Sequence, residues 1–211
     1  MSKLNSTAAG HALWSKIPKA NTELFALTYG SLITELLKDY EQDIPAINAQ
    51  LEQIGFSIGI RCIDELLAKS EGSGNANVQI PNCRDLRDTA EVVAKIGFRM
   101  FLGIGCEVGK VTNKSFSLFL NENPLSIFVE LPQSEDDNGN GDDSGKGKTD
   151  WSQLKYSNIY CGVIRGALEQ VNMKVECDFA RDVLRGHDVN EIKVELKEVM
   201  VDGAGEDYHE E

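Results

Sequence analysis

The sequence predicts an α+β fold in which helices pack on one face of a four-stranded antiparallel sheet. Segments with apolar residues at helical spacing are grouped before the first strand-like segments, instead of alternating with them. Two later segments, 174–179 and 191–197, alternate polar and apolar residues, as expected of strands with one wet and one buried face. Together, the order and the alternation exclude a Rossmann-type parallel sheet.

The N-terminal part is predicted to be helical after a short arm. Residues 1–20 carry no sustained period and predict a flexible arm. From Asn21 to about Tyr40, leucines at helical spacing predict the first helix. The second helix begins near Pro45, a favourable residue for a first helical turn. Its apolar positions follow at steps of three or four: Ile47, Leu51, Ile54, Ile58, Cys62 and Leu66.

Two glycines, Gly55 and Gly59, lie one turn apart inside this second helix. A glycine in a helix interior costs about 1 kcal/mol relative to alanine. The pair therefore predicts that another backbone approaches closely here. The contact is expected either between two helices of the chain or between two subunits.

The rest of the chain is divided by a polar loop and an insert. Residues 71–82 predict a Gly/Asn-rich loop, and a third helix is expected over about 83–102. The segment 115–132 predicts two short strands joined by the turn NENP. The Gly/Asp/Ser/Lys run at 133–149 cannot bury a core. A fourth helix, about 152–171, precedes the two alternating strands.

The net charge of −13 is concentrated in two short segments. Residues 135–143 contain five acids and residues 202–211 contain five more, and neither segment contains Lys or Arg. Without these ten, 24 acids stand against 21 basic residues, so the rest of the chain carries −3. Nucleic-acid binding is excluded on this basis, because it needs a basic face. We expect a domain over 21–200 with an acidic insert at 133–149, followed by an acidic tail at 201–211.

Composition and spacing also bear on the cellular location, on the state of the cysteines and on metal binding. No segment approaches the ~18 uninterrupted apolar residues of a transmembrane helix, and no signal-peptide run is present, which predicts a cytoplasmic location. Five cysteines without CxxC spacing indicate reduced thiols instead of disulfides or a zinc site. An EF-hand-like run starts at Asp136, but its twelfth position is Gly147 instead of Glu, so no metal site is predicted.

Cys83 is the one cysteine with a distinctive local setting. Asn82 is a favourable N-cap and Asp85 can complete a capping box, which would place Cys83 in a first helical turn. A helix N-terminus favours the thiolate, and Arg84 and Arg87 add positive charge. The pattern is typical of a reactive thiol, although a partly exposed cysteine without a role fits it too. His11, His187 and His209 lie in the arm, a turn and the tail, and none is placed to activate a cysteine as in a Cys-His hydrolase.

Five blocks of sequence resemble one known family. They are NTELFALTYGSLITELLKDYE at 21–41, GFSIGIRCIDELLAKS at 55–70, NPLSIFVELP at 123–132, YSNIYCGVIRGALEQVNMKVECDF at 156–179 and DVLRGHDVNEIKVEL at 182–196. In this order they resemble the Bet-three family, the third subunits of the TRAPP vesicle-tethering complex.

The resemblance implies a sheet flanked by helices and dimerisation through the first two helices. The partner would be a second copy or a related TRAPP small subunit, and the contact would give Gly55 and Gly59 a purpose. It also implies a non-enzymatic scaffold that helps to activate a Rab GTPase by nucleotide exchange in endoplasmic reticulum to Golgi transport. Such a subunit is cytoplasmic and touches Golgi and endoplasmic reticulum membranes peripherally.

The family carries palmitate as a thioester on a cysteine before the third helix, and that position matches Cys83. The acyl chain enters a channel inside the same subunit, where Gly97 would leave room for it. The residue before the cysteine, usually arginine in the family, is Asn82 here. In the tail, Gly205, Glu206 and Asp207 match residues that contact the GTPase in the family.

Two other functions stay open on the sequence. One is a small-molecule or haem sensor of related fold, which would bring a bound ligand or chromophore. The other is a Cys-dependent acyl transferase, in which Cys83 would turn over instead of keeping its acyl group.

Overall fold

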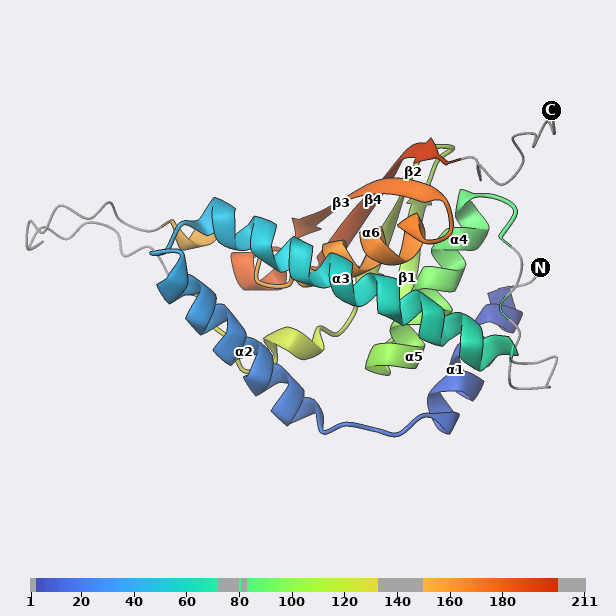
Figure 1. The fold of residues 1–211 in the computed structure, drawn as a ribbon, viewed down its shortest axis with the longest axis horizontal. Coiled ribbons are helices and arrows are strands. Elements are labelled where there is room, and N and C mark those ends of the chain that lie inside the picture. Colours follow the sequence, from blue (N-terminus) through green and yellow to red (C-terminus); the bar gives the residue numbers. More distant parts are fainter. Residues whose placement is uncertain (1–2, 72–79, 81–82, 133–149, 201–211) are drawn as a thin grey trace, which may run out of the picture.

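The structure is a computed structural model that describes residues 3–71, 80, 83–132 and 150–200. Its helices are α1 (Lys3–Lys16), α2 (Thr22–Asp39), α3 (Ile44–Glu71), α4 (Leu86–Val92), α5 (Phe98–Leu102) and α6 (Ile159–Glu169). Its strands, labelled in Figure 1 with the helices, are β1 (Cys106–Val111), β2 (Ser115–Leu120), β3 (Met173–Arg181) and β4 (Asn190–Val199). The acidic insert and the acidic tail lie outside the described residues.

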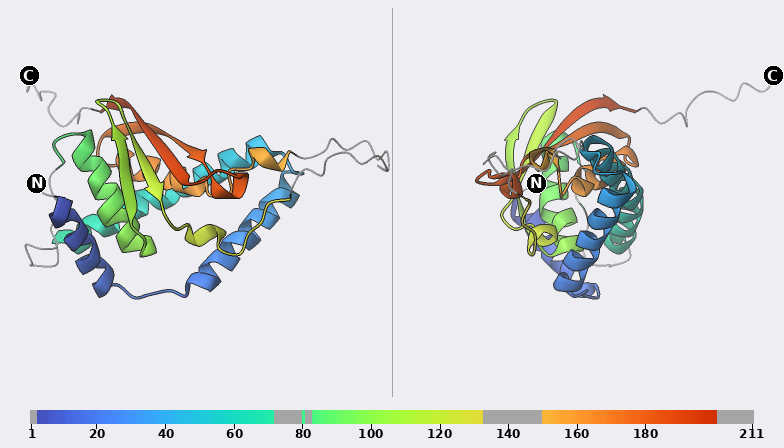
Figure 2. Two further views of the ribbon diagram at one scale, coloured as in Figure 1. Left: turned by 180° about the vertical axis from the view of Figure 1, so that it is seen from behind. Right: turned by 90° about the vertical axis from the view of Figure 1, so that its left-hand side faces the viewer.

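The four strands form one antiparallel sheet in the order β1-β2-β4-β3, which confirms the predicted fold class. The end-on view of Figure 2 shows the sheet along one side of the molecule and the helices along the other. At the centre, Phe116 pairs with Val194 and Leu118 with Ile192. These four side chains are at most 1% exposed. Burying each contributes about 1.5–3 kcal/mol, which holds the sheet against the helices.

Helices α3 and α6 pack backbone against backbone, and glycines make this possible. A Cβ on Gly55 would lie 2.1 Å from the carbonyl oxygen of Ile159, and one on Gly59 would lie 2.2 Å from another carbonyl of α6. In return, Cβ atoms on Gly162 and Gly166 would lie 2.0 and 2.2 Å from carbonyls of α3. The predicted close approach is confirmed as a contact within the chain. Of the two alternatives for Gly55 and Gly59, the contact between two helices of the chain is therefore the one observed, and dimerisation through the first two helices stays a prediction.

The N-terminal arm is a helix over most of its length, so the expectation of a flexible arm over 1–20 is wrong for Lys3–Lys16. Ala9 and Leu13 are 2% and 1% exposed and pack against Ile96 and Met100. Because α1 buries only this narrow stripe, its sequence shows no sustained apolar periodicity. Helix α2 follows the prediction, because Asn21 caps it by accepting from the Leu24 amide at 2.7 Å.

One predicted strand is absent and another was missed. Residues 125–132 form no strand, because Asn123 accepts from the Leu125 amide at 3.2 Å and begins a short 3-10 turn. The fourth strand is instead β1, where Gly109 makes room for the ring of Phe119 on β2. The fourth helix is also shorter than expected, because regular α6 begins only at Ile159.

Candidate functional site

A large apolar cavity lies inside the helical layer. Its volume is about 1360 Å³, above the range of about 300–1,000 Å³ for ordinary small-molecule pockets. Helix α3, the helix from α4 to α5, and α6 form most of its walls, and residues of β3 and β4 add to the lining. The lining is mainly aliphatic and aromatic, as in Leu66, Val93, Phe98, Ile164 and Leu168.

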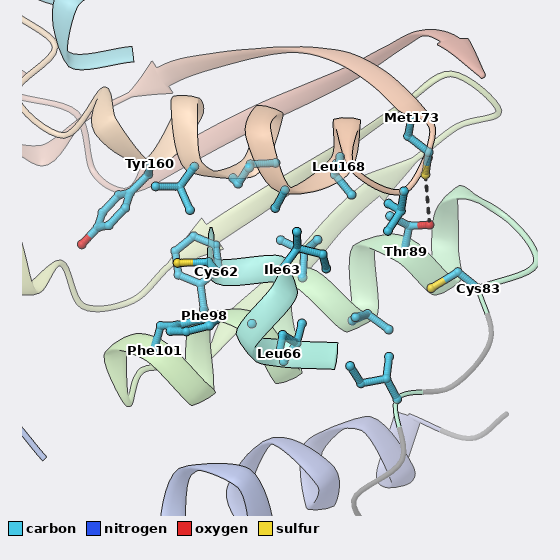
Figure 3. Close-up of a pocket in the computed structure, with 18 of the residues that line it drawn as sticks. Cys62, Ile63, Leu66, Cys83, Thr89, Phe98, Phe101, Tyr160, Leu168 and Met173 are labelled. Atoms are coloured by element: carbon cyan, nitrogen blue, oxygen red, sulfur yellow. Dashed lines mark hydrogen bonds between the residues drawn. The ribbon is translucent and has the colours of Figure 1, made fainter. Parts of the chain in front are cut away.

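The cavity is long as well as large. Figure 3 shows Cys83 and Thr89 beside Met173 at one end, and Tyr160, Phe98 and Phe101 at the other. Between Leu86 and Phe101 the α4–α5 helix lines it over about 20 Å, at about 1.5 Å per residue. One leaflet of membrane hydrocarbon, half of the full core, is about 15 Å thick. A hydrocarbon chain that spans one leaflet therefore fits along this helix.

The helix that lines the cavity changes its winding midway. Val93–Gly97 is π-helical between α4 and α5, and such insertions are frequent at functional sites. Gly97 lies on the cavity wall. A Cβ there would meet only the carbonyl oxygen of Val92, at 3.9 Å, which is an ordinary contact. A larger side chain at this position would extend into the cavity.

Cys83 lies at the open end of the cavity, before the helix instead of inside it. Helix α4 begins at Leu86, and its N-cap is Asp85, whose side chain accepts from the Asp88 amide at 2.8 Å. The predicted helix start at Cys83 is therefore wrong, and Asn82 lies outside the described residues. Cys83 is exposed, yet it also lines the cavity, and Figure 3 shows its sulfur turned inward.

The electrostatics of Cys83 differ from the prediction as well. Burial of the thiol raises its pKa, a hydrogen bond with Thr89 lowers it, and the carboxylates of Asp88 and Asp85 raise it. The net direction is upward, so the expectation of a thiolate favoured by the helix start and by arginines is wrong. The thiol must lose its proton against two nearby negative charges.

The other thiols belong to the cavity wall and the core. Cys62 lines the cavity from α3, and burial raises its pKa. Cys106 and Cys161 are fully buried, and burial raises the pKa of Cys106 to about 12. Cys177 lies on β3 with its pKa raised mainly by burial. Cys106 and Cys161 are therefore core residues, and Cys177 is half-buried against the core.

Neither His11 nor His187 lines the cavity. His11 is exposed on α1, and His187 contacts the backbone of Asp182 through its Nδ1. His209 and the predicted GTPase contacts Gly205, Glu206 and Asp207 lie outside the described residues.

Within the described residues, no group of three or more His, Cys, Asp or Glu could hold a metal ion. The same part of the chain contains no helix that is both long and apolar enough to cross a membrane.

The local sequence singled out Cys83 and the family resemblance singled out Gly97, and both lie on the cavity. It missed Thr89 and the second glycine pair on α6, although the spacing of Gly162 and Gly166 repeats that of Gly55 and Gly59. The π-helical segment carries no recognisable signal in the sequence.

Comparison with known proteins points to one family. Residues 25–195 match the family described as Transport protein particle (TRAPP) component. The chain is 48% identical over 195 residues to trafficking protein particle complex subunit 3 of Dictyostelium discoideum, covering 92% of each chain. It is 40% identical over 199 residues to transport protein particle subunit bet3 of Schizosaccharomyces pombe, covering 93% of this chain and 95% of that one.

A solved structure is similar in both sequence and fold. It is trafficking protein particle complex subunit 3 from Naegleria fowleri, described as covalently bound to palmitic acid. It is 46% identical to this chain with a TM-score of 0.69, covering 86% of this chain and 98% of that one.

Proposed function

Since the chain belongs to the family of TRAPP components, we propose that it is a non-catalytic scaffold subunit of the TRAPP vesicle-tethering complex that is acylated on Cys83. The acyl group is palmitate, held as a thioester, and its hydrocarbon chain lies in the cavity. The single observation that carries this proposal is the position of Cys83 at the open end of a long apolar cavity. The palmitate bound to the Naegleria fowleri relative supports the same assignment.

The acyl chain acts as part of the core and not as a membrane anchor. Burying a sixteen-carbon chain at about 0.8 kcal/mol per methylene gains on the order of 10 kcal/mol gross. Extracting the chain from the cavity into a bilayer would forfeit the packing against the surrounding side chains. Contact with Golgi and endoplasmic reticulum membranes is therefore peripheral, through the assembled complex.

The partners are a second copy of this chain or related TRAPP small subunits, bound through α2 and α3. Exposed leucines on α2 support this surface. Leu24 and Leu27 are 67% and 58% exposed, whereas Ile33 and Leu36 on the same helix are buried. An apolar stripe left open on a helix indicates a protein contact. The assembled complex contributes to nucleotide exchange on a Rab GTPase of endoplasmic reticulum to Golgi transport, with Gly205, Glu206 and Asp207 in the contact.

Incubation with labelled palmitoyl-CoA tests the proposal against its alternatives. We expect one stable label per chain in the wild type and none in a Cys83→Ser variant. Repeated release of free palmitate would contradict the scaffold role and favour an acyl transferase. A purified protein that takes no label but carries a chromophore or a different ligand would favour a sensor.

A further inference from the structure

Helix α1 covers the cavity from one side. Its buried residues Ala9 and Leu13 belong to an apolar cluster that also contains Leu66 of α3. Ile63 and Val92 are half-buried and pack against the same cluster. Leu66, Ile63 and Val92 line the cavity as well. These three side chains therefore form a wall, one residue thick, between α1 and the space that would hold an acyl chain.

The cluster lies where two walls of the cavity meet, and α1 bridges them. Figures 1 and 2 show α1 beside α5, near the end of α3. Towards the α4–α5 helix α1 makes a close backbone contact, since a Cβ on Gly10 would lie 2.0 Å from the carbonyl oxygen of Lys95 in the π-helical segment. Towards α3 the contact is made by side chains, among them Leu66. Helix α1 therefore closes the seam between α3 and the α4–α5 helix.

The surface that holds α1 in place is small. Among its described side chains, only Ser6, Ala9 and Leu13 are buried. By contrast, α6 buries seven of its eleven residues. An isolated helix of about 14 residues is marginal in water, so the stability of α1 depends on this contact. Elements with few buried apolar contacts open locally at a lower free energy than the whole fold. We therefore expect α1 to detach while the rest of the chain stays folded.

An acyl chain on Cys83 starts at one end of the cavity, and its methyl end must reach the other. The path follows about 20 Å of the α4–α5 helix, at about 1.5 Å per residue. Entry by the end would take the chain past Thr89 and Met173, whose oxygen and sulfur lie 3.8 Å apart in Figure 3. Detachment of α1 would instead uncover the seam from the side, where the wall is one residue thick.

We propose that α1 is a side lid, which detaches to admit the acyl chain between α3 and the α4–α5 helix and then docks over the filled cavity. The inference rests on the proposed acylation for the identity of the chain. No bond forms or breaks when the lid moves. Because entry and exit both pass through the open state, a lid changes the two rates by the same factor and leaves the affinity nearly unchanged.

The test measures stopped-flow binding of cis-parinaric acid, a fatty acid that fluoresces in apolar surroundings, to the full chain after hydroxylamine treatment. Leu13→Ala removes most of a side chain that is 1% exposed and does not line the cavity. The loss of this buried contact favours the detached state. We expect the association and dissociation rate constants both to rise by at least about tenfold, while the Kd stays within about twofold of the wild type.

Leu36→Ala is the matched control. Leu36 is also buried, but it lies on α2 in the main core and does not line the cavity. This variant should lose stability and keep the wild-type rate constants. The inference is overturned if Leu13→Ala keeps the wild-type rate constants or raises only the dissociation rate constant. It is also overturned if Leu36→Ala accelerates both steps as much as Leu13→Ala, or if the wild-type chain does not bind the probe.

Hydrogen exchange gives a second readout that needs no variant. In the acylated wild type, detachment of α1 would expose hydrocarbon to water, so it should occur less often than in the hydroxylamine-treated chain. We expect the amides of residues 9–16 to exchange at least about tenfold more slowly in the acylated form. Equal exchange in the two forms would contradict the lid. A wild-type chain that accepts no acyl group would contradict the proposed function, whereas the rate constants for cis-parinaric acid decide the role of α1 independently.

Discussion

Helix α3 has two very different neighbours. Towards α6 its backbone touches another backbone, and a Cβ on Gly55 would lie 2.1 Å from a carbonyl oxygen. Towards the α4–α5 helix it faces a cavity of about 1360 Å³, and a Cβ on Gly97 in the opposite wall would meet nothing closer than 3.9 Å. Gly55 therefore allows α3 and α6 to pack in direct backbone contact, whereas Gly97 leaves space in the cavity. Protein interiors are normally close-packed, so a gap of this size indicates a ligand that completes the core.

Substitution at the closed contact should have the largest effect on stability. A Cβ on Gly162 would lie 2.0 Å from the carbonyl of Glu52 and 2.7 Å from the amide of Phe56. Since both are backbone atoms, α3 and α6 must separate, and we expect Gly162→Ala to lower the free energy of unfolding by about 3 kcal/mol. Urea denaturation measures this. Gly97→Ala is the control and should change stability by less than about 1 kcal/mol; equal losses in the two variants would remove the distinction between the two glycines.

A bulky residue in place of Gly97 should prevent acylation without preventing folding. Gly97→Leu directs its side chain into the cavity, so we expect a folded protein that loses most of its palmitate label. Its melting temperature should match that of hydroxylamine-treated wild type and lie below that of the acylated wild type, because a bound acyl chain stabilises only the folded state. Full labelling of Gly97→Leu would show that the chain does not pass this wall.

Removing a charge beside Cys83 should change reactivity and leave stability nearly unchanged. Asp88 raises the pKa of the Cys83 thiol because its negative charge disfavours the thiolate. Asp88→Asn should therefore lower that pKa and roughly double the rate of alkylation at neutral pH. In the wild type the Asp88 carboxylate accepts a hydrogen bond of 3.1 Å from the Arg84 backbone N–H, and the amide oxygen of an asparagine can still accept it. An unchanged or slower rate would contradict this account of the entrance.

The exposed face of α2 should tolerate charge best of all. Leu27→Glu places a carboxylate on a side chain that is 58% exposed, so we expect the stability of the isolated chain to change by no more than about 0.5 kcal/mol. The same change should prevent association with a second copy or a related subunit. Light scattering coupled to gel filtration measures the mass, and an unaltered oligomer would exclude this face as the interface.

Periodicity was sufficient for the fold class and for β3 and β4, because polar and apolar residues alternate strictly there. It was insufficient for β1, where Gly109 and Lys110 interrupt the alternation, and for α1, which buries little beyond Ala9 and Leu13. The start of the third helix was also predicted three residues too early, because two possible N-cap residues lie close together in the sequence. Asn82 and Asp85 are both favourable N-cap residues. The structure uses Asp85, and the first residue of the helix, Leu86, is buried.

The cavity could not be predicted from residue patterns, and only the family resemblance implied a channel. Its lining residues, such as Ile63 and Leu168, are the same types that fill a closed core. Whether two helices touch or stay apart depends on their backbones, as the contrast between Gly55 and Gly97 shows. The place of Cys83 before the third helix could be anticipated, but the rise in its pKa depends on burial and on the carboxylates of Asp88 and Asp85 in three dimensions.

The most direct test of the central claim is the intact mass of the purified full chain, before and after hydroxylamine, beside a Cys83→Ser variant. We predict a mass gain equal to one palmitoyl group in the wild type, removed by hydroxylamine and absent from the variant. A wild-type chain at its unmodified mass, or a palmitoyl group that persists in Cys83→Ser, would contradict the assignment of the cavity to an acyl chain on Cys83.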